Sequence, residues 1–241
     1  MREVITRYGR HNIGFLWLFL EPMLFTLGVT TLWTVIGVTH GSTLPITAFA
    51  ITGYSSILLW RNCSNRAVKA IEPNLALLYH RNVRVFDVFA ARLTLEIAGA
   101  STSIIVLTVL FTSIGWMNQP ADILTAVTGW VLLAWFAFSL SLAVGAASER
   151  SEIIERVWHI FTYLMFPLSG AGFMVGWLPK PYQNIILYVP MVNGTEMIRH
   201  GYFGSVVRTY ENPSYLILFN VILTFIGLAL MRETGRRVEP E

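Results

Sequence analysis

Long apolar runs alternate with short polar breaks along most of the chain. A helix that crosses a bilayer needs roughly 20 mainly apolar residues, and six runs approach or exceed that length. The pattern therefore predicts an all-α polytopic membrane protein with one transmembrane domain over residues 23–241. The six expected spans cover residues 23–39, 44–60, 85–112, 122–147, 158–176 and 214–231.

Residues 1–22 precede the first expected span and have a different pattern. Three arginines alternate with apolar residues, and an aromatic cluster follows, as in amphipathic helices that lie in the headgroup layer. Pro22 disfavours helical geometry at Glu21 and suits the first turn of a new helix. We therefore expect an interfacial amphipathic helix that turns at Glu21–Pro22 into the first span. A proton or substrate site at Glu21 is the alternative.

Basic residues distinguish the two sides of the membrane. All but three of the 17 lysines and arginines lie at the chain ends or near polar breaks that share one side, the exceptions being Lys180, Arg199 and Arg208. Loops rich in Lys and Arg stay in the cytoplasm. Both termini are therefore expected to be cytoplasmic, and residues 177–213 are expected to face outward.

The chain before and within this outer segment is rich in Gly and Pro. The stretch FPLSGAGFMVGWLP at residues 166–179 cannot form one straight helix. Non-helical backbone at membrane depth survives only when it is buried in protein or lines water, so we expect short re-entrant helices on the outer side. Glu196 and Arg199 are three residues apart and could form an ion pair. A contact between Arg199 and an acidic polymer is the alternative.

Composition supports the membrane assignment and excludes several kinds of site. The chain is 54% hydrophobic and 13% charged, with a mean hydropathy of +0.58, whereas soluble domains carry about 25% charged residues. Cys63 is the only cysteine, which excludes an internal disulfide and a multi-cysteine metal site. HExxH, GxSxG and GxxxxGK(S/T) motifs are absent, and the five histidines lack metal-ligand spacing. We expect no catalytic residue, no metal and no nucleotide site.

Active transport by a chain without a nucleotide site requires an ion gradient or a separate ATPase. Ion-driven carriers usually hold charged residues near the bilayer midplane, and the central parts of the first, second, fourth and sixth expected spans contain none. Arg92 and Glu96 share a helix face at the entrance of the third span, where a mutually neutralising pair is favoured over a substrate contact. An external motor is therefore favoured. An ion-coupled carrier or channel is the rival, and an intramembrane enzyme is disfavoured.

The polar break at residues 61–84 is too long for a tight turn and contains an apolar cluster. The cluster lies between Pro73 and Arg81 and consists of Leu75, Leu77, Leu78 and Tyr79. A cytoplasmic apolar cluster needs a covering surface, which a short helix seated in a groove of a partner would provide. Packing against the ends of the chain's own spans is an equal alternative.

Four stretches in fixed order carry a resemblance to a known family. They are LWLFLEP at residues 16–22, IEPNLALLYHRNVRVFDVFAARLTLE at 71–96, FPLSGAG at 166–172 and VPMVNGTEMIRHGYF at 189–203. With the six-span plan, they resemble the permease subunit of ABC-2 exporters, and more narrowly the inner-membrane permease of bacterial capsular polysaccharide exporters. Val189 and Asn193 depart from the pattern, since related exporters often have Asn and His at these positions.

The resemblance implies a bacterial inner-membrane permease that pairs with a second copy of itself and with two cytoplasmic ATPase subunits, which bind ATP and Mg²⁺. It implies a coupling helix around Glu72–Arg81 seated in the ATPase, and a weaker contact at residues 148–156 that includes Glu149 and Glu152. The cargo would be lipid-linked capsular polysaccharide, passed to a periplasmic co-polymerase and an outer-membrane channel. No nucleic acid is implied. O-antigen, teichoic acid or a drug-like amphiphile is the alternative cargo.

Aromatic residues are numerous, with eight Trp, nine Tyr and fifteen Phe. Most are expected in lipid belts or packing, and some could form a track on which the apolar faces of sugar rings stack. The candidates near the expected conduit are Trp33, Tyr54, Trp60, Trp135, Tyr163 and Phe166.

Overall fold

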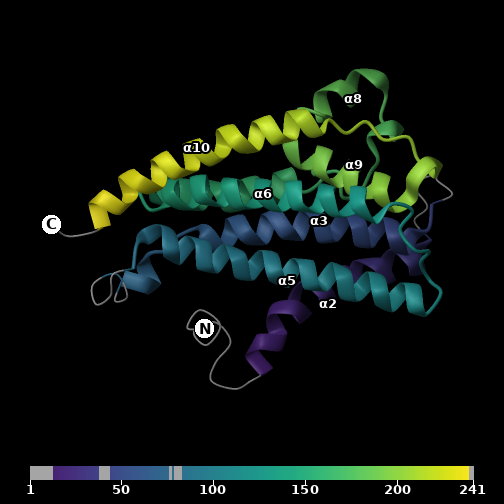
Figure 1. The fold of residues 1–241 in the computed structure, drawn as a ribbon, viewed down its shortest axis with the longest axis horizontal. Coiled ribbons are helices and arrows are strands. Elements are labelled where there is room, and N and C mark those ends of the chain that lie inside the picture. Colours follow the sequence, from purple (N-terminus) through teal and green to yellow (C-terminus); the bar gives the residue numbers. More distant parts are fainter. Residues whose placement is uncertain (1–12, 38–43, 76–77, 79–82, 239–241) are drawn as a thin grey trace.

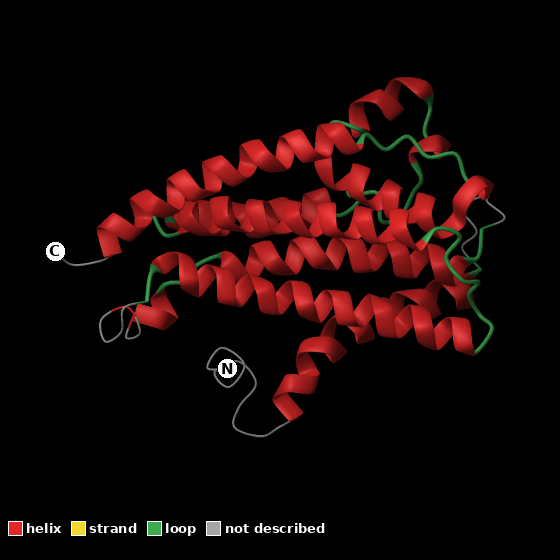
Figure 2. Ribbon diagram, viewed as in Figure 1, coloured by secondary structure: helices red, strands yellow, loops and turns green. Residues whose placement is uncertain are grey.

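The computed structural model describes residues 13–37, 44–75, 78 and 83–238, and this part of the chain is built from helices without strands (Figure 2). Five long helices run along the molecule (Figure 1), namely α2 (Ile13–Ile36), α3 (Ile46–Ala67), α5 (Val85–Ser113), α6 (Ile123–Ser148) and α10 (Pro213–Val238). The shorter helices are α7 (Glu152–Met165), α8 (Lys180–Ile186) and α9 (Pro190–Phe203). Short 3₁₀ turns occur at η1 (Glu72–Asn74), η2 (Val175–Trp177) and η3 (Gly204–Val206).

Three of the described helices are long and apolar enough to cross a membrane, which agrees with the all-α membrane class expected from the sequence. They are α5, α6 and the Pro213–Arg236 part of α10. The apolar part of α2, Leu20–Ile36, is shorter. α3 has 22 residues but ends in a polar turn that includes Arg66. Six spans therefore stay a prediction.

Glu21 and Pro22, expected at a corner between two helices, lie inside one helix, because α2 continues through both residues. Proline inside a helix removes one hydrogen bond and kinks the helix, and Figure 1 shows the first part of α2 diverging from the bundle. Hydroxyls on the following turns use backbone acceptors: Thr26 donates to the Pro22 carbonyl at 3.0 Å and Thr30 to the Thr26 carbonyl at 2.7 Å. Residues 1–12 lie outside the described residues, so the interfacial helix stays a prediction.

The helix α7 covers only part of the residues 158–176 that the apolar run assigned to one span. It begins earlier, at Glu152, and ends at Met165 after 14 residues, or about 21 Å. The next residues form turns without a helix, and Gly170 there adopts a φ of 80°. The hydrocarbon core is about 30 Å thick, so α7 alone is too short to cross it.

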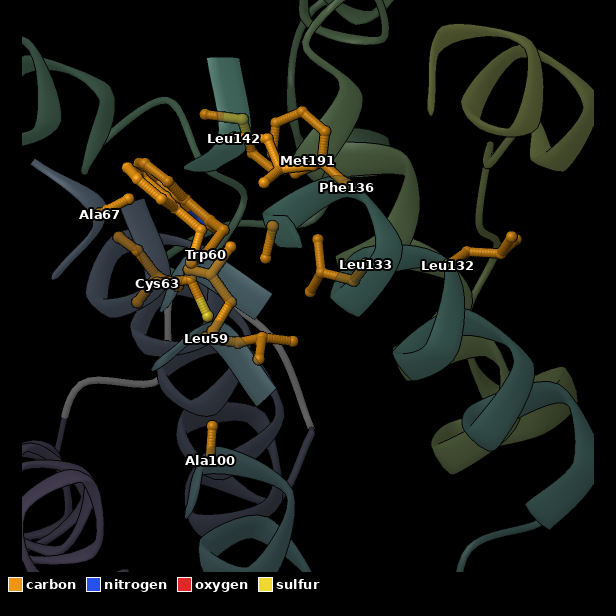
Figure 3. Close-up of a cluster of buried hydrophobic side chains, with 14 of the residues drawn as sticks. Leu59, Trp60, Cys63, Ala67, Ala100, Leu132, Leu133, Phe136, Leu142 and Met191 are labelled. Atoms are coloured by element: carbon orange, nitrogen blue, oxygen red, sulfur yellow. The ribbon is translucent and has the colours of Figure 1, made fainter. Parts of the chain in front are cut away.

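The central helix α6 packs against α3, α9 and α10. Buried side chains of α3 and α6 form the main core, including Trp60, Cys63 and Leu133 (Figure 3). Glycines allow close approach at the crossings: a Cβ added at Gly201 would lie 2.2 Å from the Ala126 nitrogen. Small residues at such crossings are typical of membrane helix pairs.

Candidate functional site

The segment after α3, predicted to couple to an ATPase, is partly described and divides into exposed and buried residues. Glu72 and Pro73 in η1 are exposed, and Leu75 is 38% exposed. Leu78 instead packs against the core cluster, so the apolar cluster does not form a single exposed surface. Leu77, Tyr79 and Arg81 lie outside the described residues, and their role stays a prediction.

The turn that leads into η1 is held by the end of α6. Lys69 has a φ of 51°, a conformation that is uncommon for residues with a Cβ. Its backbone N–H donates to the Ser148 hydroxyl at 3.2 Å, and the backbone N–H of Ile71 donates to Oε1 of Glu149 at 2.9 Å. The residues just before the implied coupling helix are thus hydrogen-bonded to the second implied contact, at residues 148–156.

Glu149 is half-buried and faces its own chain. Burial raises the pKa of its carboxyl above the ordinary glutamate value, while the Ile71 N–H and the Lys69 charge oppose that shift. Glu152, the other predicted contact in this turn, is exposed and lies 3.5 Å from Arg156 as an i,i+4 ion pair. Of these two glutamates, Glu152 has the more exposed side chain.

The same turn is joined to the end of α10 by Arg150. Its Nη1 lies 2.8 Å from Oε2 of Glu233, and its Nη2 donates to the Leu230 carbonyl at 2.8 Å. The sequence did not indicate a role for Arg150, because its partners lie about 80 residues later and no local pattern predicts the contact. The α6–α7 turn therefore connects the coupling segment to the last helix.

A group of four charged residues ties α2, α3 and α5 together. Arg66 of α3 lies 3.5 Å from the Glu21 carboxylate and 3.8 Å from that of Glu96. Arg92 donates to the Arg66 carbonyl at 3.2 Å. Glu21 was predicted as one feature and Arg92 with Glu96 as a pair, and Arg66 was missed because it was one of many basic residues in its loop. This geometry favours a structural role for Glu21.

The half of the molecule that contains α9 is organised around Arg199, whose side chain is fully buried. Its guanidinium donates to the carbonyls of Gly170, Ala171 and Phe173 at 2.6–2.7 Å and lies 3.9 Å from the centre of the Phe49 ring. These contacts clamp the irregular segment after α7 onto α3 and α9. Charged hydrogen bonds of this kind are among the strongest in proteins.

The predicted ion pair between Glu196 and Arg199 does not form among the described contacts. Glu196 accepts the backbone N–H of Val175 at 3.2 Å, so both side chains bind the backbone of the same irregular segment. Because Arg199 is fully buried, it cannot contact an acidic polymer in this conformation, which was the alternative expected from the sequence. Backbone carbonyls accept the hydrogen bonds of the Arg199 guanidinium, which was expected to pair with the Glu196 carboxylate.

Asn193, one of the two departures from the related exporters, holds the start of α9. Its amide donates to the Leu187 carbonyl at 2.8 Å and accepts the Asn212 N–H at 2.9 Å. Val189, the other departure, precedes the first residue of α9. These positions therefore shape the outer segment in this chain.

Three of the six predicted aromatic candidates come together. Tyr54 lies 5.2 Å from Trp33 and 5.8 Å from Phe166 between ring centres, and Phe49, which was missed, stacks on Trp33 at 6.1 Å. This aromatic cluster joins α2, α3 and the segment after α7. Because Tyr54 is buried, the cluster is packed in this conformation.

The other three candidates lie elsewhere. Trp60 is enclosed in the core, Trp135 donates to Thr224 of α10 at 3.0 Å, and Tyr163 is exposed on α7 with Arg61 4.7 Å from its ring centre. Trp60 belongs to the same large core cluster as Tyr54, and Trp135 packs against that cluster.

Comparisons with known proteins agree with this architecture. A family model described as ABC-2 type transporter matches residues 1–203. The whole chain is 49% identical to the capsule polysaccharide export inner-membrane protein CtrC of Neisseria meningitidis serogroup B, covering 91% of it. It is 44% identical over its whole length to BexB of Haemophilus influenzae, a protein with the same description, again covering 91%.

A more distant relative shows the same full-length correspondence. The polysialic acid transport protein KpsM of Escherichia coli is 28% identical over 96% of this chain and 90% of its own length. The resemblance drawn from the four sequence stretches is confirmed by these matches. The chain belongs to the ABC-2 type transporter family.

Proposed function

We propose that the chain is the transmembrane permease subunit of an ATP-driven exporter that moves lipid-linked capsular polysaccharide across the bacterial inner membrane. The observation that carries the proposal is its full-length similarity, at 49% identity, to a protein named for capsule polysaccharide export. The sequence has no phosphate-binding loop of the GxxxxGK(S/T) type. ATP and Mg²⁺ are therefore bound by a separate ATPase subunit, and this chain performs no bond chemistry.

In the proposed topology the chain crosses the membrane six times with both termini in the cytoplasm. The spans are α2, α3, α5, α6, α7 with the residues that follow it, and α10. The distribution of Lys and Arg supports this orientation. The short helices α8 and α9 then lie on the outer side as re-entrant elements that close the exit path.

Coupling begins at the exposed residues Glu72, Pro73 and Leu75, which seat in a groove of the ATPase. Movement of this segment pulls on the α6–α7 turn through the bonds from Lys69 and Ile71. The Arg150 contacts pass the same movement to α10. Glu152 offers a second, weaker contact to the ATPase.

A second copy of the chain completes the conduit. On α7, the side chains of Ile153, Val157, Ile160 and Leu164 form an exposed apolar stripe. Pro167 and Leu168 in the irregular segment that follows are exposed as well. Irregular backbone cannot face lipid at membrane depth, so a second copy packed along α7 supports this segment and leaves a path for the polysaccharide between the two subunits.

The wider assembly receives the polysaccharide on the outer side. Two permease chains and two ATPase subunits pass it to a periplasmic co-polymerase and an outer-membrane channel. The aromatic cluster of Trp33, Phe49, Tyr54 and Phe166 lies beside α7, where it could contact sugar rings once the subunits separate.

Co-purification of the chain with its ATPase subunit tests the proposal. Leu75→Asp combined with Glu72→Arg should weaken the association about tenfold, as expected for loss of an interface anchor. Asn184→Arg, an added charge on the opposite side of the membrane, serves as the control and should leave the association unchanged.

A strain that lacks the chain should also lose surface capsule. The coupling proposal is contradicted if no ATPase subunit co-purifies with the unchanged chain and the variant with Leu75→Asp and Glu72→Arg exports capsule normally. If the deletion strain keeps its capsule while another surface glycan is lost, the cargo assignment is contradicted and the ATPase coupling stands.

A further inference from the structure

An open groove separates the first turn of α5 from the last turns of α10. Its volume is about 340 Å³, within the range of ligand pockets. Both helix ends lie at the same end of the bundle (Figure 1). The lining combines three arginines with an apolar floor: Arg84, Arg232, Arg236, Val85, Phe86, Leu228, Met231 and Gly235.

The described part of the chain offsets only part of the positive charge of this groove. No lining residue is acidic, and Arg84, Arg232 and Arg236 are exposed without a carboxylate partner among the described residues. Of the nearby acids, Asp87 accepts the backbone N–H of Arg84 at 2.9 Å. Glu233 pairs with Arg150 on the α6–α7 turn.

The apolar and the basic residues of the groove follow one another along α10. Leu228 and Phe86 are exposed apolar residues, while Arg232 and Arg236 lie one and two turns further along α10, toward the proposed cytoplasmic side. An acyl chain could therefore follow the apolar floor while a phosphate reaches the guanidinium groups. Guanidinium binds phosphate through paired N–H donors, and basic pockets between spanning helices are suited to anionic lipid headgroups.

We propose that this groove binds one anionic phospholipid of the inner leaflet, with its phosphate held by Arg84, Arg232 and Arg236. The lipid would bridge α5 and α10 at the membrane surface. The charge complementarity distinguishes an anionic from a zwitterionic occupant. This inference does not depend on the identity of the exported cargo.

Lipid binding to the full-length chain, purified with any ATPase subunit that accompanies it, tests the proposal. Native mass spectrometry after delipidation should show preferential binding of phosphatidylglycerol over phosphatidylethanolamine. Replacing all three arginines of the groove with Gln should weaken phosphatidylglycerol binding on the order of 100-fold. Arg156→Gln, which removes an exposed arginine on α7, should change it less than twofold.

A second variant separates a specific site from general attraction to surface charge. A Cβ added at Gly235 meets no atom within 4 Å, so Gly235→Trp can fill the groove while keeping all three arginines. It should weaken phosphatidylglycerol binding at least tenfold, whereas Gly235→Ala should not.

Undiminished binding by Gly235→Trp would overturn the proposal, because binding would then depend on charge alone. Equal binding of phosphatidylethanolamine would also overturn it. Displacement of phosphatidylglycerol by soluble glycerol phosphate at equal concentration would do the same, because a free phosphate would then be the preferred occupant.

Discussion

The Glu149 carboxylate accepts the backbone N–H of Ile71 at 2.9 Å and so joins the α6–α7 turn to the coupling segment. Glu149→Ala should release this amide, and its hydrogen exchange should accelerate about tenfold, the equivalent of one charged hydrogen bond. Amide exchange of the purified complex, followed by mass spectrometry of peptides that contain Ile71, measures the effect. Glu152→Ala removes an exposed carboxylate of the same turn and should leave this exchange unchanged; equal acceleration in both variants would contradict the assignment.

The buried position of Glu149 also predicts a dependence of stability on pH. Burial raises the pKa of this carboxyl in the folded state, so the folded state binds the proton more tightly than the unfolded chain, whose glutamates titrate near about 4.3. The contribution of Glu149 is most favourable below that pH and declines as pH rises through the raised folded-state pKa.

Thermal unfolding between pH 4 and pH 7 checks this sign. Glu149→Gln keeps an oxygen that can accept the Ile71 N–H and removes the titration. The difference in midpoint between Glu149→Gln and the unchanged chain should therefore grow with pH in favour of the variant. A difference that shrinks over this range would show that ionised Glu149 is stabilised by the fold.

Arg199 is predicted to be essential for the outer half of the fold. Arg199→Ala would leave the carbonyls of Gly170, Ala171 and Phe173 without their donor and should destabilise the protein by about 3–5 kcal/mol, because each unsatisfied group costs about 1–3 kcal/mol. Arg199→Lys should recover little, because one ammonium cannot reproduce the planar fork of donors. Thermal melts in detergent measure both variants. Arg208→Ala, in the same outer region, is the matched control, and a loss of similar size there would argue against a specific clamp.

The crossing of α6 and α9 at Gly201 should tolerate no side chain. A Cβ there would approach the backbone of Ala126 and Asp122 within 2.2–2.7 Å, and backbone atoms cannot rotate away. Gly201→Ala should cost about 1–3 kcal/mol. Gly28→Ala, in α2 where a Cβ meets no atom within 4 Å, should be neutral or stabilising because alanine favours helix. Reduced yield and a lower melting temperature are expected only for the first variant.

Packing of two copies along α7 predicts a specific cross-link. Cys63 is buried, so a cysteine introduced at Ile160 can form a disulfide only with the equivalent residue of another copy. Oxidation in membranes should give a dimer for Ile160→Cys. A cysteine at Leu218, exposed on α10, should stay monomeric. Equal cross-linking at the two positions would indicate random collision.

The sequence predicted helix positions well where the apolar run has nearly the same ends as the helix. Residues 85–112 and 122–147 were expected as spans, and α5 and α6 occupy Val85–Ser113 and Ile123–Ser148. Asp122 illustrates why the boundary was readable, since its carboxylate caps α6 by accepting the Leu124 and Thr125 N–H groups. Hydropathy did not predict where α10 ends, because the helix continues to Val238, beyond its apolar part. Hydropathy indicates which residues lie in the membrane, whereas helical hydrogen bonds can continue past the membrane surface.

The bonding of the candidate site could not be read from the sequence in the same way. Arg150 and Leu230 are 80 residues apart, and Ser148 and Lys69 are 79 apart, so no local pattern specifies their meeting. Glu21 and Arg199 were identified as unusual, but their partners depend on how α2, α3 and α9 pack. The hydrogen-bond partners of Arg199 are the carbonyls of Gly170, Ala171 and Phe173, and main-chain carbonyls supply no sequence signal.

Because Arg199 binds only main-chain oxygens of the segment after α7, it recognises the course of the polypeptide there and is indifferent to the side chains. The exposed side chains there, such as those of Pro167 and Leu168, could therefore change without disturbing these bonds, whereas Ala171 and Val175 are buried and are constrained by packing.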